Sequence, residues 1–182
     1  MSMWKDDARR FGWISILLHW LVAAMVVGLF ALGLWMTGLS YYDPWYRQAP
    51  DLHKGIGVLL FLLLAFRLVW RSINGRPGPV AGSGRLEHRL AVVAHGALYA
   101  LMILVMISGY LISTADGRGI DVFGLFSVPA TIQGVEGQED MAGTVHLALA
   151  IGLVGLAGLH ALAALKHHFL DRDETLKRML RP

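Results

Sequence analysis

The chain has no cysteine among its 182 residues. This absence excludes disulfides, thiolate metal sites, iron–sulfur clusters and the C-x-x-C-H attachment of a covalent haem. Charged residues are also scarce, at 16%, whereas 55% of the residues are hydrophobic. A composition this apolar excludes an ordinary soluble domain and predicts one membrane domain over residues 1–182. With thiolates absent, the eight histidines are the strongest candidates for metal ligation.

Four apolar segments are long enough to cross a bilayer as helices. They cover about residues 13–36, 53–71, 86–113 and 141–165. We therefore predict an all-α fold, an integral membrane four-helix bundle. No acidic residue lies in the interior of a span, which disfavours a proton path built on carboxylates.

The connections between the spans differ in composition. Residues 37–52 are rich in tyrosine and tryptophan, which favour the membrane–water boundary. Residues 72–84 carry the proline and glycine pattern of a loop. Residues 114–140 form the longest polar connection, within which IDVFGLFSVPA is apolar enough to lie against the membrane surface. The tail, HHFLDRDETLKRMLRP, is predicted as a short amphipathic or extended cytoplasmic end.

The distribution of positive charge predicts the orientation. The N-terminal residues, the 71–89 connection and the tail, together with Arg67, carry 13 of the 16 Lys and Arg residues. The positive-inside rule therefore places both termini in the cytoplasm, for a multi-pass protein of the bacterial inner membrane. The net charge of +3 reflects this topology and indicates no nucleic-acid partner.

Four histidines fall into two pairs by depth. His146 and His160 are 14 residues apart in the last span, so both lie on one helix face, about 21 Å apart along the axis. His19 lies early in the first span, at the cytoplasmic depth of His160. His53 begins the second span, at the outer depth of His146. A b-type haem needs two axial imidazoles, and facing helices of a bundle supply them, so the spacing predicts two haem b groups.

Other residues at these depths are candidates for contacts with the cofactor. Gly33 lies 14 residues after His19 and leaves room for a macrocycle, and Arg67 lies 14 residues after His53. The guanidinium of Arg67 can pair with a haem propionate or extend to the interface. His95 is an alternative axial ligand, a propionate partner or part of a quinone pocket, and an interhelical hydrogen bond is an equally good interpretation.

The chain resembles the bacterial cytochrome b561 family over almost its whole length. The motifs are LLHW around His19, LHKGIG followed by FRLVWR, and AHGALYALMILVMISGYL around His95. FGLFSVPA and HLALAIGLVGLAGLHALAALKHHFLDRD complete the match. The resemblance implies a four-helix bundle with two b haems, ligated by His19, His53, His146 and His160. It also implies electron exchange with ubiquinone or another membrane quinone, and some members are superoxide oxidases.

The expected function is single-electron transfer between the quinone pool and a periplasmic partner. Superoxide is one candidate for that partner, and Lys54, with Arg47 and Arg118, would give this anion a positive mouth at the outer face. One alternative is a cytochrome b subunit that anchors a membrane dehydrogenase or hydrogenase. A non-redox transporter, or a zinc or proton-relay protein lined by histidines, is a further alternative.

Overall fold

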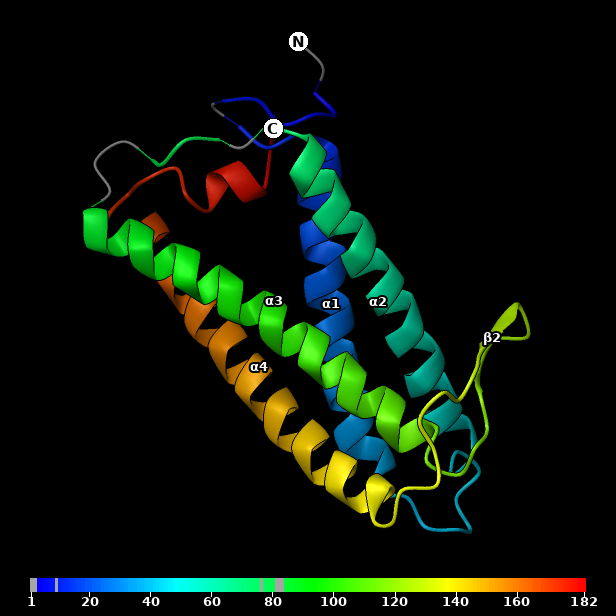
Figure 1. Cartoon of the computed structure of the whole chain (residues 1–182). Helices are drawn as coiled ribbons and strands as arrows, with labels where there is room; N and C mark the ends of the chain where they lie inside the picture. The colour runs from blue at the N-terminus through cyan, green and yellow to red at the C-terminus, as the bar shows by residue number, and fades with distance from the viewer. Residues whose placement is uncertain (1–2, 9, 76, 81–83) are drawn as a thin grey trace. The chain divides into compact units, whose positions relative to one another are not determined.

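The structure is a computed structural model that describes residues 3–8, 10–75, 77–80 and 84–182. Its four long helices are α1 (Trp13–Met36), α2 (Gln48–Ile73), α3 (Arg85–Ser113) and α4 (Gln138–Phe169) (Figure 1). Each is long and apolar enough to cross a membrane. The predicted all-α membrane architecture with four spans is confirmed.

The helix ends differ from the prediction where polar residues extend an apolar segment. α1 has the predicted bounds, whereas α2 begins at Gln48 and not at His53. Pro50 lies in the first turn, where a helix tolerates proline, and Asp51 in that turn complements the helix dipole. α4 extends at both ends for the same reason, with acidic residues in its first turn and basic residues in its last.

The tail and the 72–84 connection also have defined structure. His167 to Phe169 belong to α4, and a short 3₁₀ turn, η1 (Lys177–Met179), follows within the tail. The predicted start of the tail at His167 was therefore wrong, because α4 continues to Phe169. Basic residues in the last turn of a helix stabilise that turn through the helix dipole. Of the predicted loop, Arg76 and residues 81–83 lie outside the described residues.

A small β-hairpin lies between α3 and α4, where an apolar surface segment was predicted. Its strands, β1 (Ile120–Val122) and β2 (Phe126–Val128), are antiparallel. Phe123 and Gly124 in the turn have φ values of +55° and +69°. Both values lie in the left-handed region, which glycine adopts freely and phenylalanine adopts at a cost.

The described residues form two compact units. Unit 1 comprises Met1–Ala23, Leu63–Tyr99 and Gly155–Pro182, and unit 2 comprises Ala24–Leu62 and Ala100–Val154. Each of the four helices contributes one segment to each unit. Unit 1 contains both ends of the chain and the α2–α3 connection, and unit 2 contains the hairpin.

The ends of the chain contact each other within unit 1. The indole Nε1 of Trp20 donates a hydrogen bond to the carbonyl oxygen of Met179 at 2.7 Å. Nη1 of Arg178 donates to the carbonyl oxygen of Gly78 at 2.9 Å, and the backbone N–H of Gly78 donates to Ala8. These contacts hold the tail, the α2–α3 connection and the N-terminal residues at one end of unit 1.

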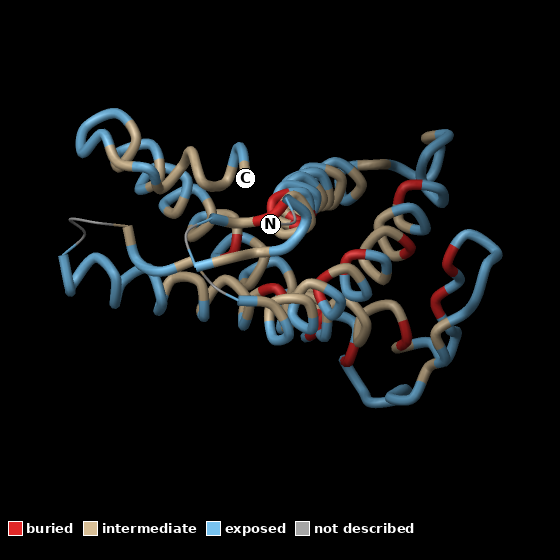
Figure 2. The backbone as a smooth tube through the Cα atoms, turned by 90° about the horizontal axis from the view of Figure 1, so that it is seen from above, coloured by how far each residue is buried: buried red, intermediate tan, exposed pale blue. Residues whose placement is uncertain are grey.

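Many residues with large apolar side chains along the helices are exposed, and few are buried (Figure 2). Buried examples are Leu18 and Leu64 in unit 1, and Leu60 and Met102 in unit 2. Helices with apolar residues on their outer surfaces need an apolar solvent, which lipid provides. The burial pattern is therefore that of helices whose outward faces contact the bilayer.

Candidate functional site

Unit 1 brings His19 and His160 together, as the sequence predicted. His19 comes from α1 and His160 from α4, and their ring centroids are 6.4 Å apart with planes at 74°. Two imidazoles on opposite sides of one metal place their centroids about 6 Å apart, given metal–nitrogen bonds of about 2 Å. The spacing therefore fits a pair of axial ligands.

Unit 2 brings His53 of α2 and His146 of α4 together with nearly the same geometry. Their centroids are 6.2 Å apart, and the ring planes meet at 73°. Nδ1 of His53 is buried without a hydrogen-bond partner among the described residues. Both pairs offer only neutral nitrogen donors, which suits a haem iron better than a hard cation such as Mg²⁺.

Backbone contacts orient the ring of His146. Its Nδ1 lies 2.9 Å from the carbonyl oxygen of Val105 and 3.1 Å from Oγ of Ser108. A carbonyl oxygen can only accept, so the ring proton sits on Nδ1 and the lone pair on Nε2 is free to bind a metal. The sequence analysis did not identify Ser108, although it lies in the MISGYL motif.

Glycines on neighbouring helices make room for the two rings of unit 2. A Cβ on Gly33 would lie 3.3 Å from Cε1 of His53, and a Cβ on Gly109 would lie 3.1 Å from Cε1 of His146. Gly33 was expected to accommodate a macrocycle, and in the structure it accommodates the imidazole of His53. The ring of Phe123 covers Gly55 in the same unit.

Arg67 lies in unit 1, where its Nη2 is 3.1 Å from Nδ1 of His19. An arginine only donates, so Nδ1 of His19 accepts and its ring proton sits on Nε2. If Nε2 of His19 held a metal, the ring proton would sit on Nδ1, and Nδ1 would no longer accept the hydrogen bond from Arg67. The guanidiniums of Arg67 and Arg71 lie 5.7 and 5.8 Å from the ring centroid of Tyr99.

His95 of α3 adds a third imidazole to unit 1. Its ring centroid is 4.9 Å from that of His160, with the planes at 72°. Its Nδ1 lies 2.6 Å from the carbonyl oxygen of Ala91. The separation of 4.9 Å is shorter than the spacing of about 6 Å that two ligands facing across one metal adopt. His95 therefore sits beside His160, not opposite it.

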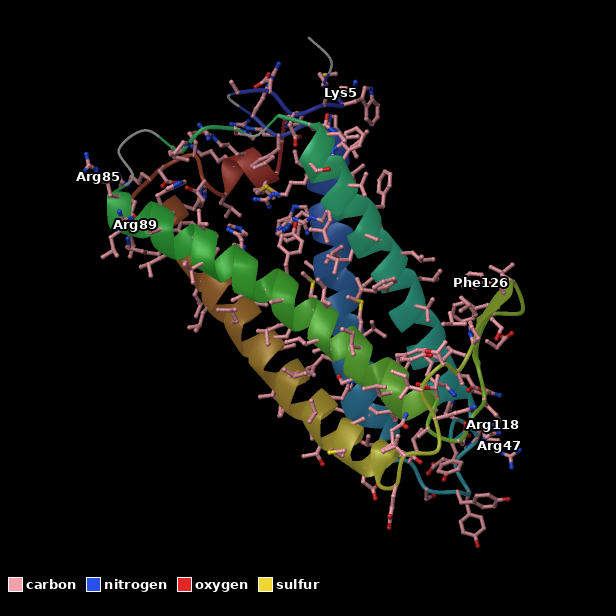
Figure 3. All side chains as sticks on the ribbon, in the orientation of Figure 1. Lys5, Arg47, Arg85, Arg89, Arg118 and Phe126 are labelled. Carbon is pink, nitrogen blue, oxygen red and sulfur yellow. The ribbon has the colours of Figure 1, made fainter. Side chains whose placement is uncertain are left out.

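Two of the three cations predicted near His53, Lys54 and Arg118, are paired with neighbouring carboxylates. Nζ of Lys54 lies 2.8 Å from Oδ1 of Asp51. Nε of Arg118 donates to Oδ2 of Asp116 at 2.7 Å, and this contact lowers the pKa of the Asp116 carboxyl from its usual value. Arg118 and Arg47 both belong to unit 2, and their side chains are labelled in Figure 3. A surface pocket beside them includes Asp51 and Asp121, so its lining contributes negative charge.

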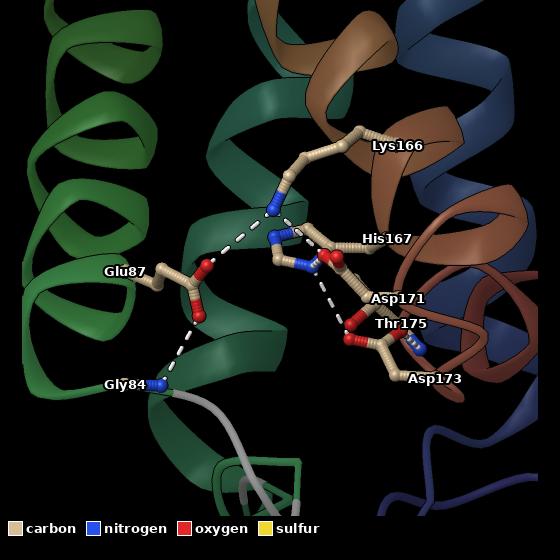
Figure 4. Close-up of polar contacts among 7 residues, drawn as sticks. All are labelled: Gly84, Glu87, Lys166, His167, Asp171, Asp173 and Thr175. Carbon is tan, nitrogen blue, oxygen red and sulfur yellow. Dashed lines mark hydrogen bonds and ion pairs between the residues drawn. The ribbon is translucent and has the colours of Figure 1, made fainter.

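A separate polar cluster in unit 1 joins the start of α3 to the tail (Figure 4). Nζ of Lys166 lies 2.8 Å from Oδ2 of Asp171 and 3.5 Å from Oε1 of Glu87. Nδ1 of His167 lies 2.8 Å from the same Asp171 oxygen. The ammonium of Lys166 already supplies the positive charge between these carboxylates, so the cluster is an ion-pair network.

We expect Asp171→Asn to release the tail from this cluster. The hydrogen bond from Lys166 holds the pKa of the Asp171 carboxyl below its usual value, so the contribution of the ion pair is present at neutral pH and is lost as the pH falls through the lowered pKa. Limited proteolysis of residues 170–182 should be about twofold faster in the variant at neutral pH, because exposed ion pairs are weak. At low pH the two proteins should be cleaved at equal rates. Unchanged cleavage at neutral pH would contradict the expectation.

Comparison with known proteins agrees with this arrangement. The sequence profile described as "Prokaryotic cytochrome b561" matches residues 10–182. The chain is 53% identical over 175 residues to "Cytochrome b561 homolog 2" of Escherichia coli (strain K12), covering 96% of this chain and 93% of the relative. It is 30% identical over 174 residues to "Probable superoxide oxidase CybB" of Yersinia pestis, covering 94% of this chain and 96% of the relative.

A third relative is "Cytochrome b562" of Cereibacter sphaeroides, 28% identical over 176 residues and covering 93% of this chain and 94% of the relative. The match thus extends over nearly the whole of each protein, and it includes the four membrane helices with all the histidines described above. The chain belongs to the prokaryotic cytochrome b561 family and is a multi-pass haem protein of electron transfer in the bacterial inner membrane.

Proposed function

We propose that this cytochrome holds two b-type haems and transfers single electrons between the membrane quinone pool and a partner at the outer face. The observation that carries the proposal is the pair of matching imidazole spacings, 6.4 Å in unit 1 and 6.2 Å in unit 2. A bound haem supplies one-electron chemistry as its iron changes oxidation state. The protein supplies the axial nitrogens, apolar surroundings and access to the two faces of the membrane.

The ligands follow from the helices that meet in each unit. His19 and His160 would hold one haem in unit 1, and His53 and His146 would hold the other in unit 2. α4 supplies one ligand to each haem, while α1 and α2 supply the other two. Because each pair lies within one unit, each haem would be bound independently of the other.

Arg67, Arg71 and Tyr99 would bind the propionates of the haem in unit 1. The structure pairs neither guanidinium with a carboxylate in the part of the chain that it describes. The hydroxyl of Tyr99 is buried there without a hydrogen-bond partner. Two cations and a free hydroxyl at membrane depth need anionic acceptors, which haem propionates provide.

The orientation follows from charge. Unit 1 contains 13 of the 16 Lys and Arg residues, including those near both ends of the chain. Under the positive-inside rule, both termini would lie on the cytoplasmic side, and the starts of α2 and α4, which carry His53 and His146, would lie on the periplasmic side. The haem held by His53 and His146 would then exchange electrons with the periplasmic partner.

Superoxide is the donor that we propose to test first at the outer face, because a relative that matches over nearly its whole length is named as a probable superoxide oxidase. Two superoxide anions would each give up one electron and leave as O₂, and one quinone would take two electrons and two protons to become a quinol. Lys54 would bind the superoxide anion only if its ion pair with Asp51 opened. His95 stays a candidate for a quinone contact from the sequence.

The testing experiment is a dithionite-reduced absorption spectrum of the purified protein, with haem measured per chain. Two b-type haems per chain are expected. One haem would show that one histidine pair is not a ligand set, and none, in protein made with ample haem, would overturn the proposal. A second assay then measures quinol formation under a steady supply of superoxide. Formation that superoxide dismutase abolishes is expected, whereas no formation would exclude superoxide as the donor.

A further inference from the structure

The two histidine pairs differ in what surrounds the α4 histidine. In unit 2, Nδ1 of His146 has the carbonyl oxygen of Val105 as its acceptor at 2.9 Å. In unit 1, His160 has no hydrogen bond within the described ranges, and its close polar neighbour is the ring of His95 at 4.9 Å. A histidine that binds a metal almost always donates its other ring N–H to an acceptor, so His160 lacks a partner that its counterpart has.

The tautomer of His95 makes it the acceptor that His160 needs. Nδ1 of His95 lies 2.6 Å from the carbonyl oxygen of Ala91, which can only accept a hydrogen bond. The proton of neutral His95 therefore sits on Nδ1, and Nε2 carries a lone pair. Arg67 and Arg71, whose charges also lie near His95, only donate hydrogen bonds and cannot fill this role.

The edge-to-face geometry of the two rings also excludes His95 as the axial ligand opposite His160. The two rings are too close to face each other across a metal, and their planes are nearly perpendicular. His19, at 6.4 Å, is the ring with the spacing of an opposing ligand. His95 and His19 therefore occupy different positions around His160, one for support and one for ligation.

We propose that His95 is a positioning residue for His160, with Nε2 of His95 accepting a hydrogen bond from Nδ1–H of His160 when haem is bound. The inference rests on the proposed function. The hydrogen bond would fix the tautomer of His160 that presents Nε2 to iron. It would also make the His160 imidazole more electron-rich, which lowers the reduction potential of that haem.

The test compares His95→Phe with His95→Gln in the full-length, haem-loaded protein. Phenylalanine fills the space of the imidazole but cannot accept a hydrogen bond, whereas the glutamine carbonyl oxygen can. His88→Phe, at an exposed position one turn into the same helix, is the matched control. Each protein is examined by potentiometric titration and low-temperature electron paramagnetic resonance, which report each haem separately without an activity assay.

The expected result is a change in one haem only. His95→Phe should raise the reduced-to-oxidised ratio of the unit 1 haem about tenfold at a fixed potential, which corresponds to about 59 mV for a one-electron couple. The resonance of that haem should shift with it. His95→Gln should recover most of the difference, and His88→Phe should match the unchanged protein. Wild-type haem content is measured first, so that failure of the two-haem proposal is seen separately.

Three outcomes would overturn the inference in a protein that binds two haems. If phenylalanine and glutamine variants both keep the wild-type potentials, the contact with His95 has no effect on His160. If the potential of the unit 2 haem moves instead, the effect is not local to this pair. If both variants lose one haem, His95 is an axial ligand and the pairing of His19 with His160 is wrong.

Discussion

Replacing His19 with alanine should reduce the haem content from two per chain to one. The substitution removes one of two imidazoles whose spacing, 6.4 Å, fits axial ligation in unit 1. Alanine offers no donor atom, and His95 sits beside His160, where it cannot supply the opposite bond in this arrangement. The haem held by His53 and His146 should remain, because both of its ligands lie in unit 2.

The measurement is haem per chain after extraction, together with the reduced spectrum. His88→Ala serves as the control, since it removes an exposed imidazole from unit 1 without touching either pair. Retention of two six-coordinate haems in His19→Ala would refute the ligand assignment. Loss of both haems in a protein that still elutes as a folded species would show that unit 2 does not hold its haem independently.

The sequence predicted the four spans and placed the four histidines in two pairs. It could do so because both inferences depend on distance along a helix, and helix geometry is regular. The spacing of 14 residues puts His146 and His160 on the same face of the helix, about 21 Å apart along its axis, independently of the neighbouring helices. The observed ring separations of 6.4 and 6.2 Å agree with those pairs.

Element boundaries and short strands could not be predicted from the sequence with the same accuracy. The start of α2 was placed five residues late because its first turn, which includes Pro50 and Asp51, is polar and precedes the apolar run that defined the span. The hairpin was missed because its strands have only three residues each, too few for a period-two pattern.

The side-chain partners around the histidines were the least predictable part of the site. Arg67 was recognised as a cation at membrane depth, but its contact with His19 joins α2 to α1. His95 was left with several roles because its position beside His160 depends on how α3 meets α4. The sequence showed which residues could carry the chemistry, while the structure showed which of them are neighbours.

We expect Gly109→Val to displace His146 and to weaken the haem in unit 2 selectively. A Cβ at this position would already lie 3.1 Å from Cε1 and 3.3 Å from Nδ1 of His146, before the valine methyl groups are added. Nδ1 is also hydrogen-bonded to the carbonyl oxygen of Val105, so the ring cannot move away without losing that contact. Overpacking of this kind costs about 1–3 kcal/mol, which corresponds to a loss of haem affinity of about fivefold to 150-fold.

Gly96→Val is the matched control, because Gly96 lies on the same helix and a Cβ there would meet nothing within 4 Å. Valine has a better helix propensity than glycine, so neither variant should lose helix stability, and a difference between them reports the contact with His146. Titration of haem into protein made without it should show one weakened site in Gly109→Val and two unchanged sites in Gly96→Val. Equal haem affinities in the two variants would mean that His146 has room to move, and the close packing against Gly109 would then not be what holds the ring in its ligand position.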